Sequence, residues 1–239
     1  MVKVALVTGS AVRIGRKIAI HLAESGWDLA LHYSSSKREV LSLKSELALK
    51  FPNLRLEIFQ ANLLDIVQTE NLVKSVINRF GLLDLLINNA SVFEPSSLKK
   101  TTSELLIKHS MINYIAPFIL MRDFARQQDK GQIINILDTR ITTNKSDYLA
   151  YSLSKKTLFE LSKMSALELA PNFRVNAIAP GAVLPPPGKD QIYLDQIACK
   201  TPMKIPSGTS SIMKTIDYII DNKDITGQTI YCDGGSHLM

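Results

Sequence analysis

The chain has 239 residues, of which 46% are hydrophobic and 21% are charged, so its composition excludes a disordered, collagen-like or low-complexity protein. Its net charge of +6 arises from 28 scattered basic residues against 22 acidic ones. This favours an anionic small molecule as partner, and no nucleic acid is expected. The two cysteines and four histidines show no metal-ligand spacing, so no metal site is expected either.

The sequence predicts neither a membrane span nor a signal peptide. The longest nearly apolar stretch, residues 111–121, is too short to cross a bilayer. The first seven residues lead directly into a turn and lack the apolar length and cleavage site of a secretory signal. We therefore expect a cytoplasmic protein without a membrane partner.

Short β-rich runs alternate with stretches of helical period along the whole chain, and the runs are nearly continuous in apolar residues, as buried parallel strands are. The predicted strands are residues 2–8, 27–33, 54–59, 83–88, 132–138, 174–179 and 228–232. The predicted helices are residues 13–25, 37–50, 66–80, 103–128, 150–170 and 209–221. This order predicts a single domain, residues 1–239, with a Rossmann-type doubly wound α/β fold and a seven-stranded parallel sheet.

Residues 182–206 interrupt the alternation. Three consecutive prolines, at 185–187, exclude regular helix there, and the segment follows the carboxyl end of a predicted strand. Long irregular inserts are either disordered or cover a functional site. Since open α/β sheets bind ligands at this edge, we expect an irregular lid over a substrate site.

A loop suited to phosphates follows the first strand and opens the first helix, with the sequence Thr8-Gly9-Ser10-Ala11-Val12-Arg13-Ile14-Gly15. Gly9 permits the tight turn, and Gly15 allows the helix to pack closely on the strand. The helix N-terminus offers backbone N–H groups to a pyrophosphate, and Arg13 adds a permanent cation. The position of this loop between strand and helix predicts a dinucleotide.

The end of the second strand indicates which dinucleotide binds. NAD sites usually place an acidic residue there to bind the ribose 2′-hydroxyl. Here residues 32–38 contain no acid, but they do contain Ser34, Ser35, Ser36 and two cations. Hydroxyls and cations suit a 2′-phosphate, so NADP(H) is the predicted cofactor. The alternative is an ordinary polar turn that caps the next helix.

Tyr151 and Lys155 lie one helical turn apart, on the same face of a predicted helix. Tyr33 and Lys37 have the same spacing, but they lie at a strand end and form no helical pair. Together with the phosphate loop, the Tyr151–Lys155 pair makes the sequence resemble the short-chain dehydrogenase/reductase family. The resemblance extends over essentially the whole chain. Further matching pieces are Asn88-Asn89-Ala90-Ser91, Asn113, Pro180-Gly181 and Asp233-Gly234-Gly235.

The sequence departs from the common family pattern at three positions. At these positions it resembles the pteridine reductase branch of the family, which includes dihydromonapterin and dihydrofolate reductases. Asp138 stands where serine is usual, Arg13 where glycine is usual, and Phe93 where an aromatic is rare.

The carboxylate of Asp138 also carries a chemical argument of its own. It would repel the alkoxide that forms when a ketone is reduced, whereas it would stabilise the iminium formed when a C=N bond is reduced. A protonated carboxyl can also relay a proton through Tyr151. An Asp that only caps the end of a strand remains the alternative.

The resemblance implies further roles. Lys155 is expected to bind the nicotinamide ribose and to lower the pKa of the Tyr151 phenol, and Asn113 to hold a water that resupplies protons. Phe93 is expected to stack on the pterin, although a packed core phenylalanine is the alternative. The expected catalytic residues are Asp138, Tyr151, Lys155 and Asn113, and the substrate-binding residues are Arg13, Ser91, Phe93, Asp138 and Tyr151. The expected cofactor-binding residues are Gly9, Arg13, Ile14, Gly15, Tyr33, Ser34, Ser35, Ser36, Asn62, Leu63, Asn89, Ala90, Ser91, Tyr151, Lys155, Pro180, Gly181 and Val183.

The sequence therefore predicts an NADPH-dependent reductase that converts a dihydropteridine or dihydrofolate to its tetrahydro form. A carbonyl reductase of 3-oxoacyl thioesters is the alternative within the family, and a catalytically idle nucleotide sensor is a rival of another class. The resemblance also implies a homotetramer formed through the helices at 103–128 and 150–170. The choice among biopterin, monapterin and folate stays open.

Overall fold

The computed structural model describes residues 2–185, 188 and 190–239. Its centre is a seven-stranded sheet in the order β3-β2-β1-β4-β5-β6-β7, with every neighbouring pair parallel. The fold class predicted from the sequence is confirmed. The strands are β1 Val4–Val7, β2 Asp28–Tyr33, β3 Leu56–Gln60, β4 Leu85–Asn88, β5 Gly131–Ile136, β6 Phe173–Pro180 and β7 Thr229–Cys232.

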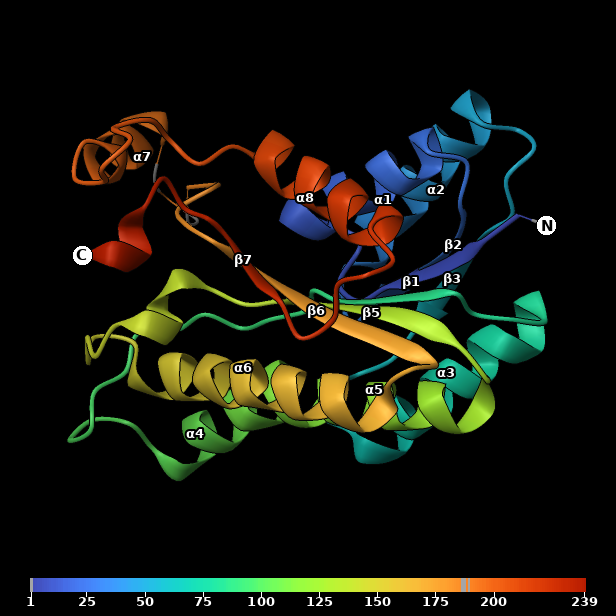
Figure 1. Ribbon diagram of the computed structural model, residues 1–239, viewed down its shortest axis with the longest axis horizontal. Helices are drawn as coiled ribbons and strands as arrows, with labels where there is room; N and C mark the ends of the chain where they lie inside the picture. Colours follow the sequence, from blue (N-terminus) through green and yellow to red (C-terminus); the bar gives the residue numbers. More distant parts are fainter. Residues whose placement is uncertain (1, 186–187, 189) are drawn as a thin grey trace.

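Helices cover both faces of this sheet, as Figure 1 shows. One layer consists of α1 Arg13–Glu24, α2 Lys37–Lys50 and α8 Thr209–Asp221. The other consists of α3 Ile66–Phe80, α4 Ser103–Ser110, α5 Ala116–Gln127 and α6 Leu149–Leu169.

Successive residues of a strand point to opposite faces, and β4 shows the consequence. Leu85 and Ile87 belong to the hydrophobic cluster beneath α1 and α8, whereas Leu86 belongs to the cluster beneath α3 and α5. All three are fully buried. This explains why the strand has no polar alternation in its sequence, since both of its faces are covered.

The predicted helix at 103–128 is not one regular helix. It consists of α4, a π-helical turn at Met111–Ile115 and α5, and Asn113 lies in the π-helical turn. Such turns are rare and occur often at functional sites. The predicted strand at 132–138 ends at Ile136, because the side chain of Asp138 caps the short 3₁₀ helix Thr139–Thr142 by accepting a hydrogen bond from the N–H of Arg140.

The expectation of an irregular insert at 182–206 is wrong in part, because the segment contains a helix, α7 Gln191–Ala198. The carboxylate of Asp190 accepts a hydrogen bond from the N–H of Tyr193 at 3.3 Å, so a cap residue starts the helix as soon as the proline run is passed. Two of the three prolines, at 186 and 187, lie outside the described residues.

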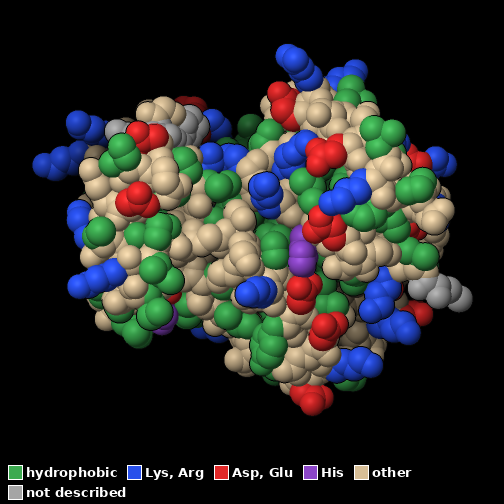
Figure 2. All heavy atoms as spheres, turned by 90° about the horizontal axis from the view of Figure 1, so that it is seen from above, with side chains coloured by type: hydrophobic (Ala, Val, Ile, Leu, Met, Phe, Trp, Pro, Cys, Tyr) green, Lys and Arg blue, Asp and Glu red, His purple; other side chains and the backbone are tan. Residues whose placement is uncertain are grey.

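Charge is mixed on the face formed by α1, α2 and α8. Figure 2 shows basic and acidic side chains interspersed there, without a single-sign patch. Among the described residues, none of the helices has the length and apolar character needed to span a membrane. In the same part of the chain, the His, Cys, Asp and Glu side chains form no group of three that could hold a metal ion.

Candidate active site

A cavity of about 810 Å³ opens where the loops that follow β1, β2, β3, β4, β5 and β6 converge. Open α/β sheets bind ligands at this edge, beside the point where the strand order reverses, which here lies between β1 and β4. The described residues that line the cavity do not include Asn113, Lys155 and Pro180. They do include the other residues expected from the sequence, namely Gly9, Arg13, Ile14, Gly15, Tyr33, Ser34, Ser35, Ser36, Asn62, Leu63, Asn89, Ala90, Ser91, Phe93, Asp138, Tyr151, Gly181 and Val183.

The loop after β1 is held tightly against the loop after β4. Gly9 has φ +64°, a left-handed conformation that favours glycine. A Cβ atom on Gly15 would lie 2.1 Å from the carbonyl oxygen of Gly9, so only glycine fits there. The side chain of Asn89 donates hydrogen bonds to the carbonyl oxygens of Thr8 at 2.9 Å and Gly9 at 3.3 Å. Strand β1, the loop and the start of α1 are thereby set as one unit.

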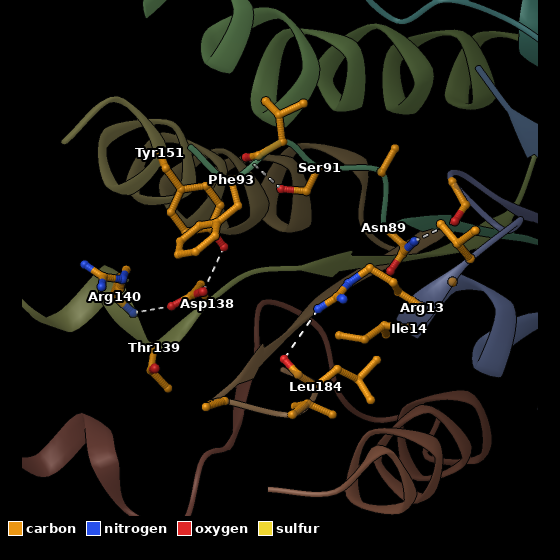
Figure 3. A pocket seen from close by; sticks show the side chains of 18 of the residues that line it. Arg13, Ile14, Asn89, Ser91, Phe93, Asp138, Thr139, Arg140, Tyr151 and Leu184 are labelled. Carbon is orange, nitrogen blue, oxygen red and sulfur yellow. Dashed lines mark hydrogen bonds between the residues drawn. The ribbon is translucent and has the colours of Figure 1, made fainter. Parts of the chain in front are cut away.

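Arg13 connects this unit to the segment that follows β6. Its guanidinium donates hydrogen bonds to the carbonyl oxygens of Pro185 at 3.0 Å and Leu184 at 3.4 Å, as Figure 3 illustrates for Leu184. Its backbone adopts φ +54°, which a non-glycine residue rarely does. The cation therefore lies beside the N-terminus of α1, where a bound anion would be stabilised by both.

The hydroxyls of residues 34–36 lie at the carboxyl end of β2 and line the same cavity. Ser36 is the N-cap residue of α2, but its side chain makes no capping hydrogen bond. The alternative of a simple helix-capping turn is therefore not supported at Ser36.

Asp138 and Tyr151 form the polar centre of the cavity, and Figure 3 shows them facing each other. The Tyr151 hydroxyl donates a hydrogen bond to the Asp138 carboxylate at 2.8 Å, and the N–H of Arg140 donates to the other carboxylate oxygen at 2.8 Å. Burial raises the pKa of Asp138, although these hydrogen bonds and the charges of Lys155 and Arg140 oppose the rise. Asp138 thus holds a proton more readily than an exposed aspartate.

Burial, followed by the Asp138 charge, raises the pKa of Tyr151 well above its ordinary value. Lys155 is not among the groups that shift this pKa here, and its expected effect on Tyr151 stays a prediction. The Nζ atom of Lys155 lies 5.9 Å from the centre of the Tyr151 ring and donates a hydrogen bond to the Ile136 carbonyl at 2.7 Å. Burial lowers the pKa of Lys155 to about 8, so the amine still carries its positive charge in most molecules at neutral pH.

Asn113 anchors the loop that follows β4. Its Oδ1 atom accepts hydrogen bonds from the N–H of Val92 at 3.0 Å and the hydroxyl of Ser91 at 3.1 Å. Its Nδ2 atom donates to the carbonyl of Val92 at 3.1 Å and to the hydroxyl of Ser154 on α6 at 2.9 Å. Its side chain is thus bonded within the protein, which does not support the expected role of that side chain in holding a water.

Phe93 is not a core residue, because 46% of it is exposed. Its ring stacks on Tyr148, with the centroids 4.1 Å apart and the planes within 6°, and meets Tyr151 edge-on at 4.6 Å. The guanidinium of Arg140 lies 4.6 Å from the Tyr148 ring and forms an ion pair with Asp147 at 2.8 Å. The alternative of a packed core phenylalanine is therefore wrong, and a flat aromatic surface lies beside the Asp138–Tyr151 pair.

Sequence reasoning missed several residues around the cavity. Arg140, two residues beyond Asp138, had a usable signal, because it follows a strand that ends at the ligand-binding edge. The residues that α7 contributes to the cavity had only a weak signal in the sequence, because the preceding prolines argue against a helix there. The missed lining residues include Thr139, Arg140, Lys108, Lys145, Tyr193, Leu194 and Ile197.

Comparisons with known proteins agree with this geometry. The chain is 30% identical to 3-oxoacyl-[acyl-carrier-protein] reductase FabG of Staphylococcus aureus (strain Mu50) over 247 residues, which cover 100% of this chain and 99% of that protein. It is also 30% identical to pteridine reductase 1 of Leishmania tarentolae over 282 residues, which cover 98% of this chain and 96% of that protein.

Among solved structures, FolM alternative dihydrofolate reductase 1 from Brucella canis, complexed with NADP, superposes with a TM-score of 0.91 and 32% identity. The match covers 99% of this chain and 95% of the other. Residues 3–192 match the family described as short chain dehydrogenase, so the chain belongs to the short-chain dehydrogenase family.

Proposed function

We propose that this protein is an NADPH-dependent reductase of pteridines that converts a dihydropteridine or dihydrofolate to its tetrahydro form. The observation that carries the proposal is the hydrogen-bonded pair of Asp138 and Tyr151 in the cavity, 2.8 Å apart. Its proton-holding carboxyl suits the reduction of a C=N bond, in which the nitrogen must gain a proton.

NADP(H) is the cofactor that the nucleotide half of the cavity suits. The structure of the Brucella canis relative contains NADP. Here the N-terminus of α1 and Arg13 suit the pyrophosphate, and the hydroxyls of Ser34, Ser35 and Ser36 suit a 2′-phosphate. When bound, NADPH supplies the hydride, and every proton must come from the protein or from water.

The proton path proposed here runs through two residues. Tyr151 donates its hydroxyl proton to the substrate nitrogen, and the protonated carboxyl of Asp138 restores it. The raised pKa of Tyr151 keeps the phenol protonated before the reaction, and the raised pKa of Asp138 makes its carboxyl a usable proton source nearer to neutral pH.

Lys155 and Phe93 complete the proposed site. The Nζ atom of Lys155 is bonded to the Ile136 carbonyl and lies outside the cavity lining, so binding the nicotinamide ribose, the role proposed for Lys155, requires its side chain to shift toward the cavity. Phe93 is a partly exposed aromatic that lines the cavity, and its side chain suits stacking on a flat pterin ring. Ser91 lies beside it in the cavity and can bond the edge of that ring.

The reduction of 3-oxoacyl thioesters is the second candidate, because the S. aureus FabG protein is as similar in sequence as the Leishmania enzyme. A carboxylate at position 138 disfavours it, since negative charge would face the developing alkoxide. A catalytically idle nucleotide sensor is disfavoured by the intact proton-donating pair.

The test follows the loss of NADPH absorbance with dihydrobiopterin, dihydromonapterin, dihydrofolate and acetoacetyl thioester in parallel, with NADH as the control cofactor. We expect turnover of at least one dihydropteridine and a preference for NADPH. Turnover of the thioester alone would contradict the proposal.

We further propose that the chain forms a homotetramer through α5 and α6. The outer surfaces of these helices carry large exposed apolar side chains, which an interface would cover. They are Phe118 on α5 and Leu153, Met164 and Leu167 on α6.

A further inference from the structure

His32 occupies a place that none of the proposed chemistry uses. It lies near the carboxyl end of β2 and is 1% exposed. Its Nδ1 atom lies 3.1 Å from the backbone N of Gly9, and its Nε2 atom lies 3.1 Å from the carbonyl oxygen of Ala61. The imidazole therefore bridges the loop after β1 and the loop after β3, and Asn62, the next residue after Ala61, lines the cavity.

These two partners determine the state of the ring. A backbone N–H can only donate, so Nδ1 must carry a lone pair. A carbonyl oxygen can only accept, so Nε2 must carry the hydrogen. The structure therefore requires the neutral Nε2–H tautomer. Burial lowers the pKa of His32 to about 4, so the ring keeps this form at neutral pH.

The bond to Gly9 fixes a peptide group that matters for the nucleotide. Gly9 adopts φ +64°, and its carbonyl oxygen is bonded by the side chain of Asn89 at 3.3 Å. Both polar atoms of Gly9 are thus engaged, the N–H by His32 and the carbonyl by Asn89. The main chain of His32 contributes as well, because its carbonyl accepts hydrogen bonds from the N–H and hydroxyl of Ser10, at 2.9 and 3.1 Å.

We propose that His32 is a positioning residue for the nucleotide-binding loop, and that its Nδ1 lone pair orients the Gly9 peptide so that the N-terminus of α1 is preset for the pyrophosphate of NADP(H). This inference rests on the cofactor of the proposed function and not on its substrate. It accounts for a buried polar side chain at a position where an apolar one would pack without needing partners.

Two variants remove one hydrogen bond each. In His32→Asn the amide oxygen takes roughly the position of Nδ1 and keeps the bond to Gly9. In His32→Gln the amide NH₂ group takes roughly the position of Nε2 and keeps the bond to Ala61. A merely structural role predicts that cofactor affinity is the same in both, because each loses one buried bond. A positioning role predicts that only the loss of the Gly9 bond weakens the cofactor.

The experiment measures the Kd of NADP⁺ by isothermal titration calorimetry and the Tm of each protein. We expect His32→Gln to raise Kd about tenfold and His32→Asn to change it by less than about threefold. Equal values of Kd in the two variants would overturn the inference. If the wild-type protein does not bind NADP⁺, the proposed cofactor is wrong.

A second measurement decides the role of His32 whether or not the cofactor binds. Nitrogen NMR of the wild-type imidazole reports the tautomer, and amide hydrogen exchange reports the opening of the Gly9 N–H. We expect the Nε2–H tautomer, with faster Gly9 exchange in His32→Gln than in His32→Asn. An Nδ1–H tautomer, or equal exchange in the two variants, would overturn the inference even if both variants unfold more easily.

Discussion

The carboxyl of Asp138 and the phenol of Tyr151 each have a raised pKa because burial disfavours their charged forms. At a surface, an aspartate this close to a tyrosine would be ionised at neutral pH and could only accept a proton. In this cavity the raised pKa values favour the proposed role of the pair, which is to hold and release one proton as a unit. The environment of Asp138, rather than its identity alone, makes it suitable for protonating a nitrogen.

The first prediction concerns Asp138. Asp138→Ser and Asp138→Asn should lower kcat for dihydropteridine reduction by about a hundredfold or more, because the proton path through Tyr151 is lost. The Kd for NADP⁺ should change by less than about threefold, because Asp138 is not expected to contact the cofactor. Asp147→Asn, which also removes a carboxylate near Arg140, is the matched control. Near wild-type turnover in Asp138→Ser would exclude the proton relay.

The pH profile of the wild-type protein belongs to the same prediction. The useful form of Asp138 is protonated, so kcat should fall as pH rises through the raised pKa of this group. In Asp138→Asn this fall should disappear.

The second prediction concerns the pH dependence of stability. The pKa of His32 is about 4 in the folded protein against 6.5 ordinarily, so between these values the unfolded state binds more protons. The contribution of neutral His32 is complete above pH 6.5 and is lost as pH falls towards 4, which amounts to about 3 kcal/mol. Urea unfolding at pH 7 and pH 5 should show a loss for the wild type about 2 kcal/mol larger than for His32→Asn. Equal losses would show that His32 is not buried in its neutral form.

At the scale of elements, the site depends on how closely α1 and the π-helical turn at Met111–Ile115 approach their neighbours. In the first turn of α1, Gly15 lies so close to the carbonyl of Gly9 that a Cβ atom would not fit between them. The π-helical turn places Asn113 between the Ser91–Val92 loop and α6. The loop after β1 and the loop with Phe93 are therefore each fixed by close contacts with a neighbouring helix.

The third prediction tests the approach of α1. In Gly15→Ala the new Cβ atom would lie 2.1 Å from the Gly9 carbonyl oxygen and 2.5 Å from Nδ2 of Asn89, so the helix must move away from the loop. We expect a stability loss of about 1–3 kcal/mol and the loss of NADP⁺ binding. Gly208→Ala is the control, since the nearest atom to its Cβ would be 4.0 Å away. An unchanged Kd in Gly15→Ala would show that the loop adapts.

Much of this architecture could be predicted from the sequence, because continuous apolar runs and helical periods translate directly into buried strands and covering helices. The predicted helix at 103–128 shows the limit. A π-helical turn leaves the spacing of apolar residues nearly unchanged, so periodicity does not reveal it. Helix α7 was missed because prolines dominate its surroundings, while its start depends on a single cap residue, Asp190.

The site was predictable to a similar degree. Loops after parallel strands must converge at one edge, so the residues expected there from motifs line the cavity, with the exception of Asn113, Lys155 and Pro180. The state of each group was not predictable. The pKa of Tyr151 depends on burial and on Asp138, and the partners of Asn113 depend on how α4, α5 and α6 pack.

At the scale of the whole molecule, apolar side chains gather on the exposed face of α6. Leu153, Met164 and Leu167 recur there at intervals that place them on one side of the helix, and all three are exposed. An isolated chain would present this surface to water. In a homotetramer α6 would carry both the site, through Tyr151 and Lys155, and an interface.

The fourth prediction tests the assembly. Leu167→Glu should convert the wild-type tetramer to smaller species in sedimentation velocity, because a charge would be placed in an apolar interface. Leu49→Glu on α2 is the matched control, since Leu49 is 87% exposed and Leu167 is 85% exposed. A wild-type protein that sediments as a monomer would contradict the proposed tetramer.

The left-handed backbone of Arg13, at φ +54°, implies that thermal stability and activity favour different residues at this position. A non-glycine residue in this conformation costs about 1 kcal/mol, and glycine would relieve that cost. Arg13→Gly should therefore raise Tm while it weakens NADP⁺ binding, because the guanidinium is removed from the proposed phosphate site. Selection for thermostability alone should therefore favour glycine at this position, and the cation would be lost. The most thermostable variant of this protein would then not be its most active one.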